Sequence, residues 1–236
     1  MEGEKMAKKK LLAAALAAVV MVTPAAGSVM PGSVVKAAGE PVETTIEKTE
    51  VSNPILGRDS NGDLLYGGDP SVLIDGDTLY LYTGRDSSTK ESYYMLEWQC
   101  YSTKDLKTWT NEGVIMKADK QSIPWANTGT DAWAGQIEKY NGKYYFYYCT
   151  WDKNANDKDS NGKQSIGVAV SDSPTGPFVD KGEPLVSGTV TTPESSGWND
   201  IDPTVWVEKD EQGQEHRYLS WGNGKVFACE LNEDMI

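Results

Sequence analysis

The strongest constraint on the fold is a segment that recurs about every 66 residues along the chain. Three stretches match one another, at residues 69–83, 134–149 and 202–221, and their starts lie 65 and 68 residues apart. Each one reads as a short apolar strand, a turn and an aromatic strand. A fixed period of this kind is typical of repeat architectures, in which one supersecondary unit is used several times.

The turns inside the repeats support a hairpin in each. The first repeat has Asp-Gly-Asp at residues 75–77 and the second has Asn-Gly-Lys at residues 141–143, whereas the third has a longer charged loop at residues 209–215. Asp-Gly and Asn-Gly between apolar runs are strong hairpin indicators. One tyrosine occupies the same place in each aromatic strand: Tyr80, Tyr145 and Tyr218.

Further strand-like runs at residues 93–103 and 165–173 raise the content to about four strands per repeat. No helical period is evident after residue 37. The sequence therefore predicts an all-β chain, and four-stranded units in radial repetition indicate a β-propeller. A β-sandwich is the alternative, but it does not require self-similarity. About three blades fit in the chain whereas propellers typically have 4–8, so we expect the N-terminal part of a longer protein.

Charge and composition limit the kinds of partner that the chain is expected to bind. The formal net charge is −13, which excludes nucleic acid as the main partner and disfavours an anionic membrane surface. The 12 Tyr and 8 Trp combine an apolar face with a polar group, which suits sugars. Three widely spaced cysteines (Cys100, Cys149 and Cys229) form no metal-binding pair, so we expect neither a zinc site nor a structural disulfide.

The N-terminus has the pattern of an export sequence. Lysines at positions 5 and 8–10 precede an apolar run of 12 residues at 11–22, too short to span a membrane. Cleavage fits after Gly27 or, preferably, after Ala37. We therefore predict a signal peptide at 1–37, a linker at 38–52, a catalytic-type domain at 53–236 and a secreted protein without a membrane partner; an uncleaved membrane anchor is the alternative.

Two of the three repeats begin with Asp-Pro, at Asp69 and Asp202, whereas the middle one has Ala134-Gly135. The first strand of a propeller blade lines the central channel, so equivalent positions face one another across it. Two carboxylates beside aromatic residues are the groups used in glycosidic bond cleavage. The alternative is that Asp-Pro serves only as a turn that opens a strand.

Several motifs together resemble glycoside hydrolase family 43, whose members are five-bladed propellers that remove arabinose or xylose from plant polysaccharides such as xylan. The motifs lie, in order, at residues 67–84, 102–109, 133–148, 170–178 and 201–207. The resemblance covers about residues 53–236. It implies a plant cell-wall polysaccharide or oligosaccharide as the substrate and no cofactor.

The resemblance also implies roles in an inverting mechanism with three acids. Asp69 matches the general base, which deprotonates the attacking water, and Asp202 matches the residue that tunes the pKa of the general acid. A Glu would be that acid, but no motif matches it here, and Glu194 lies in a Pro/Ser-rich loop. We therefore expect the acid beyond Ile236, and the 236-residue chain to be poorly active by itself.

Other residues receive weaker predictions. By the resemblance, Trp133 stacks on the sugar, although a core position between blades is the alternative. Residues 157–162 match half of a calcium loop, but Val168 stands where a Glu is needed, so we expect no metal. His216 and Asp200 are expected on solvated loops.

Two other functions remain open. An endo-arabinanase would share the fold, but the insertions at 112–130 and 152–163 favour an exo-acting pocket. A non-catalytic sugar-binding propeller would need neither Asp69 nor Asp202.

Overall fold

The computed structural model describes residues 45–47, 54–59, 61–87, 93–127, 129–152, 162–191 and 199–236. All of them belong to one compact unit, Ala38–Ile236. The predicted signal peptide, Glu194 and residues 157–161 lie outside the described residues. Within the predicted linker, Thr45–Glu47 forms a strand. The described residues contain no helix with the length and apolar character that crossing a membrane requires.

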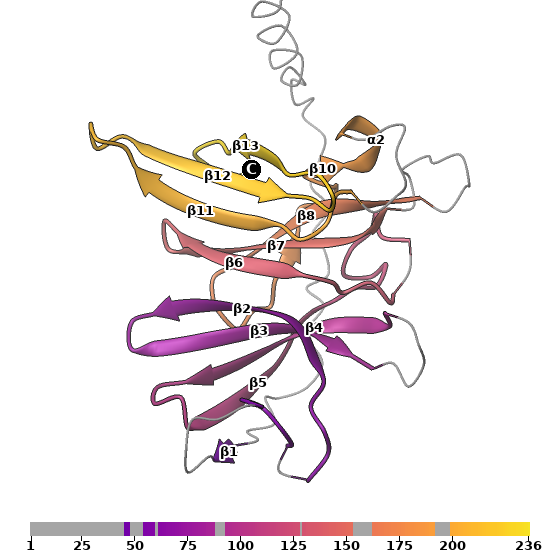
Figure 1. Ribbon diagram of the computed structural model, residues 1–236, viewed down its shortest axis with the longest axis vertical. Helices are drawn as coiled ribbons and strands as arrows, with labels where there is room; N and C mark the ends of the chain where they lie inside the picture. The colour runs from indigo at the N-terminus through magenta and orange to yellow at the C-terminus, as the bar shows by residue number, and fades with distance from the viewer. Residues whose placement is uncertain are drawn as a thin grey trace, which may run out of the picture. The chain divides into compact units, whose positions relative to one another are not determined.

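The described residues form three antiparallel sheets in chain order, drawn from indigo to yellow in Figure 1. The first sheet has the order β1-β5-β4-β3-β2, with β1 (Thr45–Glu47), β2 (Gly67–Asp75), β3 (Thr78–Asp86), β4 (Met95–Thr103) and β5 (Thr108–Lys117). The second has the order β10-β8-β7-β6, with β6 (Gly135–Tyr140), β7 (Lys143–Asp152), β8 (Lys163–Ser171) and β10 (Val186–Ser187), while β9 (Val179–Asp180) also pairs with β8. The third has the order β11-β12-β13, with β11 (Thr204–Lys209), β12 (Glu215–Trp221) and β13 (Phe227–Glu230); a single helical turn, α2 (Gly188–Thr191), follows β10.

This architecture confirms the prediction of an all-β chain with three propeller-type blades. The repeat is visible in the strand register, because each of the three equivalent tyrosines faces the first strand of its own hairpin. The pairs are Tyr80 with Leu73, Tyr145 with Glu138, and Tyr218 with Trp206. The predicted hairpin turn of the second repeat has φ of 48° at Asn141 and 78° at Gly142, as a tight two-residue turn requires.

Two apolar layers hold the sheets together. Between the first and second sheets, the ring of Trp98 lies 5.3 Å from Phe146 at 80° and 5.1 Å from Tyr148. Between the second and third sheets, Tyr147 and Cys149 of β7 pack in one cluster with Val205 and Leu219. Because these faces are filled by large side chains, truncating a buried aromatic here is expected to cost about 3–5 kcal/mol.

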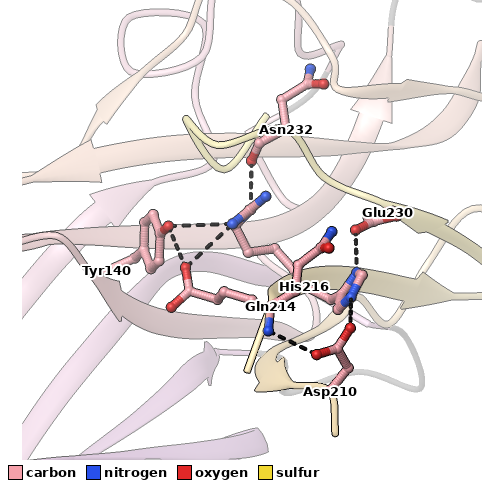
Figure 2. Close-up of polar contacts among 8 residues, drawn as sticks. Tyr140, Asp210, Gln214, His216, Glu230 and Asn232 are labelled. Atoms are coloured by element: carbon pink, nitrogen blue, oxygen red, sulfur yellow. Dashed lines mark hydrogen bonds and ion pairs between the residues drawn. The ribbon is translucent and has the colours of Figure 1, made fainter. Parts of the chain in front are cut away.

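The first strands of the three repeats lie side by side, since β2 contacts β6 and β6 contacts β11. Polar contacts join them near the ends of the repeat hairpins. Lys139 Nζ lies 2.5 Å from Asp75 Oδ1, which ties β6 to the first sheet. The Tyr140 hydroxyl donates to Glu215 Oε1 at 2.5 Å, which ties β6 to the third sheet (Figure 2).

His216 is not on a solvated loop, contrary to the prediction. It lies on β12, where its two ring nitrogens are 2.7 Å from Glu230 and 3.3 Å from Asp210 (Figure 2). The ring also stacks on Tyr218, with 5.9 Å between centroids. The charged loop ends where β12 begins, at Glu215, and His216 pairs with Glu208 of β11.

Candidate active site

Asp69 and Asp202 have the same unusual backbone conformation. Their φ angles are 50° and 57°, and each precedes a proline, a position that normally favours an extended conformation. The register between β2 and β3 shifts between Gly68 and Ser71, so Asp69 lies in a β-bulge. A bulge turns a side chain out of the regular strand direction, and left-handed conformations at residues other than glycine persist where the surroundings hold them.

The strand register places the two aspartates at equivalent levels of their sheets. Ser71 faces Tyr82, Gln136 faces Tyr147 and Thr204 faces Ser220, and these are matching positions of the three hairpins. Two residues earlier stand Asp69, Ala134 and Asp202. The first strands of the flanking sheets therefore each supply a carboxylate at the same end, and β6 between them supplies none.

The pKa of Asp202 responds to the charge of Asp69. Desolvation raises the pKa of Asp202, and the negative charge of Asp69 raises it further. Both residues keep exposed surface, so the carboxyl groups remain accessible to a ligand. Two like charges in one site raise a pKa in this way, and the raised pKa favours the protonated form of Asp202 relative to an isolated aspartate.

Cys149 of the middle repeat lies directly behind the pair. Its thiol is buried, and Sγ donates to the Ala134 carbonyl at 3.4 Å. The main-chain N–H of Asp202 points at the sulfur, and burial together with the charges of Asp202 and Asp69 raises the pKa of the thiol. Cys149 thus remains a neutral thiol.

A glutamine of the middle repeat holds the segment that follows Asp202. Gln136 Nε2 donates to the Val205 carbonyl at 3.1 Å, and Val205 N donates to Gln136 Oε1 at 3.0 Å. One side-chain amide thereby occupies both main-chain groups of Val205, as a neighbouring strand would. Gln136 has the same register as Ser71 and Thr204, so its longer side chain bridges β6 and β11.

The segment that precedes Asp202 is held as firmly. Asp200 is almost completely buried, and it accepts hydrogen bonds from Trp221 Nε1 at 2.7 Å and from the Thr191 hydroxyl at 2.5 Å. The prediction of a solvated loop at Asp200 was therefore wrong, because a tryptophan N–H and a hydroxyl replace water as its partners.

Trp133 lies two residues before β6, at the end of the strands where the aspartates stand. Its carbonyl accepts a hydrogen bond of 2.6 Å from Trp98 Nε1, and its ring meets Tyr93 edge-on with 6.1 Å between centroids. The side chain is partly buried and packs against both apolar layers. Trp133 therefore occupies a position between the blades, and its stacking on a sugar stays a prediction.

Sequence reasoning missed Gln136, Cys149 and Tyr93. The register of Gln136 could be found by aligning the hairpins from their aromatic strands. The places of Cys149 and Tyr93 follow from contacts between sheets, which no local pattern indicates. Among the described residues, no group of three His, Cys, Asp or Glu side chains could hold a metal ion.

Comparison with known proteins decides the family. The sequence profile described as "Glycosyl hydrolases family 43" matches residues 63–236. The chain belongs to glycosyl hydrolase family 43. Its relatives include "Xylosidase/arabinosidase 43A" of Humicola insolens, 32% identical over 170 residues, which span 67% of this chain and 45% of that protein.

Two further relatives mark the range of the family. "Extracellular endo-alpha-(1->5)-L-arabinanase 2" of Bacillus subtilis is 30% identical over 175 residues, which span 70% of this chain and 34% of that protein. The solved structure of an α-L-arabinofuranosidase from Clostridium thermocellum is 36% identical with a TM-score of 0.54, covering 71% of this chain and 52% of that one. The chain thus spans about half the length of the relatives it matches, or less.

Proposed function

We propose that the chain is part of a secreted glycoside hydrolase that cleaves arabinose- or xylose-containing plant polysaccharides with inversion of configuration. The observation that carries this proposal is the pair Asp69 and Asp202, which share one strained backbone conformation, stand at equivalent levels of flanking sheets and interact electrostatically. Two relatives named extracellular and the basic and apolar N-terminus support secretion.

In the proposed mechanism, Asp69 is the general base and Asp202 raises the pKa of the general acid. A base must be ionised to take a proton from the attacking water, whereas a like charge near the acid keeps that acid protonated. Asp202 fills the second role in its ionised form. Inversion places base and acid about 6.5–9.5 Å apart, which leaves room for the water. Trp133 supplies a stacking face for the sugar.

The test uses glycosides whose leaving groups need no protonation. With 2,4-dinitrophenyl arabinofuranoside or xyloside, the role of the base is measured independently of the acid. We expect weak turnover that Asp69→Asn reduces at least about 100-fold, the usual size of a general-base contribution. Asp77→Asn, which changes an exposed aspartate in the turn between β2 and β3, should leave the turnover unchanged. NMR of the first-formed sugar should show the inverted anomer. Turnover that is unaffected by Asp69→Asn, or a retained anomer, would refute the proposal.

An endo-acting arabinanase is the second candidate, because two relatives carry that name. Product sizes from linear arabinan distinguish the two: an endo enzyme releases mixed oligosaccharides early, and an exo enzyme releases single sugars. Tight oligosaccharide binding without any product from the activated glycosides would instead favour a non-catalytic sugar-binding propeller.

A further inference from the structure

The tyrosines of this chain are distributed unevenly over its surface. All twelve lie in the described residues, and only three are exposed: Tyr66 at 61%, Tyr93 at 72% and Tyr94 at 45%. All three lie at one end of the first sheet, since Tyr66 directly precedes β2 and the other two directly precede β4. We call these three residues the tyrosine rim.

Main-chain contacts hold the rim in place. The N–H of Asp86, at the end of β3, donates to the Tyr66 carbonyl at 3.2 Å, and the N–H of Ser87 donates to the Tyr94 carbonyl at 3.0 Å. The next residue, Met95, donates to the Thr130 carbonyl at 2.8 Å. Tyr66 and Tyr94 therefore stand on anchored strand ends, and an exposed ring on a fixed backbone loses less conformational entropy when a ligand binds.

The rim adjoins the candidate active site. Asp69 lies at the same end of β2, three residues after Tyr66, and Gly68 beside it faces the side chain of Met95. Tyr93 contacts Trp133 at an interplanar angle of 63°. An aromatic contact thus joins Trp133 to Tyr93, and Tyr94 and Tyr66 lie at the same end of the first sheet.

The charge of this end indicates which ligand fits. One cation at this end, Arg85, is paired with Glu97 at 2.7 Å, and the whole chain has a net charge of −13. An acidic polysaccharide would be repelled, whereas a neutral sugar can stack its C–H faces on the rings and bond its hydroxyls to the phenols.

We propose that the tyrosine rim is a binding subsite for neutral sugar units of the polymer beyond the unit cleaved at Asp69. This proposal rests on the proposed function, because it extends the same site. It predicts that affinity increases with oligosaccharide length and that the increase depends on Tyr93.

Isothermal titration of the chain with xylo- and arabino-oligosaccharides of two to six units tests the proposal. We expect Tyr93→Ala to weaken hexasaccharide binding about 3- to 10-fold and to leave disaccharide binding unchanged, given the usual strength of one aromatic contact. Tyr93→Phe should retain the affinity because the ring remains. Trp206→Ala, which removes an exposed aromatic of β11 outside the rim, is the control and should have no effect.

Any of three results would refute the proposal that the tyrosine rim is a subsite. They are an unchanged hexasaccharide affinity in Tyr93→Ala, an equal loss of affinity for short and long sugars in that variant, and binding of oligogalacturonate as tight as that of the neutral oligosaccharides. Circular dichroism of each variant establishes that the fold is retained. Failure of the rim and of the proposed function are distinguishable. If only the rim proposal fails, hydrolysis of dinitrophenyl glycosides still depends on Asp69. If the proposed function fails, that hydrolysis does not depend on Asp69, whatever the length of the sugar that binds.

Discussion

At the scale of single residues, the chemistry depends on how two carboxyl groups influence each other. The pKa of Asp202 is raised by desolvation and, in addition, by Asp69. Asp69→Asn is therefore expected to lower the pKa of Asp202 without returning it to the ordinary value, because the desolvation remains. Carboxyl ¹³C NMR titration of the selectively labelled chain measures this. An unchanged Asp202 pKa would show that the two groups do not interact.

His216 allows a second test at this scale, because it is the only histidine in the chain. Hydrogen bonds that the ring donates to the carboxylates of Glu230 and Asp210 raise its pKa above the ordinary value of about 6.5. The stabilisation by this raised pKa is complete below the unfolded-state pKa and is lost as the pH rises through the folded-state value. We expect Glu230→Gln to lower the imidazole pKa measured by NMR, and His216→Gln to destabilise the protein at pH 5 but not at pH 9.

At the scale of one element, the turn between β4 and β5 explains a motif that the sequence only suggests. Asp105 Oδ1 accepts the N–H groups of Thr108 at 2.7 Å and Lys107 at 2.8 Å, which lowers the pKa of Asp105 to about 2. Leu106 has a φ of 61°, and its carbonyl accepts a bond from Trp109 Nε1 at 3.3 Å. In the motif at residues 102–109, Asp105, Leu106 and Trp109 therefore each make a contact that fixes the turn.

The depressed pKa of Asp105 gives this turn a defined pH dependence. Its stabilisation is present above the unfolded-state pKa of about 3.9 and is lost as the pH falls through about 2. Chemical denaturation should show Asp105→Ala to be less stable than the wild type at pH 6, with the difference shrinking towards pH 2. Asp77→Ala, in the turn of the neighbouring hairpin, is a comparison at an exposed carboxylate whose pKa is lowered mainly by its hydrogen bond to the Lys104 side chain. A difference that is constant with pH would contradict the assignment.

At the scale of the whole molecule, local sequence patterns predict one part of the structure, and contacts between distant elements determine another. The hairpins, their 66-residue period and the level of Asp69 and Asp202 follow from turn residues and strand alternation, which are local. The burial of Asp200 and the pairing of His216 could not be predicted, because Trp221, Thr191 and Glu230 reach them from other elements. The same is true of Gln136, whose partner Val205 lies 69 residues away.

The contact between Gln136 and Val205 therefore tests how the sheets position the acids. Gln136→Met removes both hydrogen bonds and leaves two main-chain groups of β11 without that partner, which should cost about 1–3 kcal/mol in the free energy of unfolding. Because β11 is then held less closely to β6, we expect the pKa of Asp202 to fall and the further effect of Asp69→Asn on it to become smaller.

Tyr140→Phe is the matched control, since it breaks the bond to Glu215 at the opposite end of β6 and leaves Gln136 in place. The four combinations of Gln136→Met and Asp69→Asn form a double-mutant cycle with the Asp202 pKa as its readout. A nonzero coupling in that cycle, absent when Tyr140→Phe replaces Gln136→Met, would establish that a residue of the middle repeat sets the separation of the two acids. Equal coupling for both substitutions would mean that general loosening of the sheets, and not this amide, controls it.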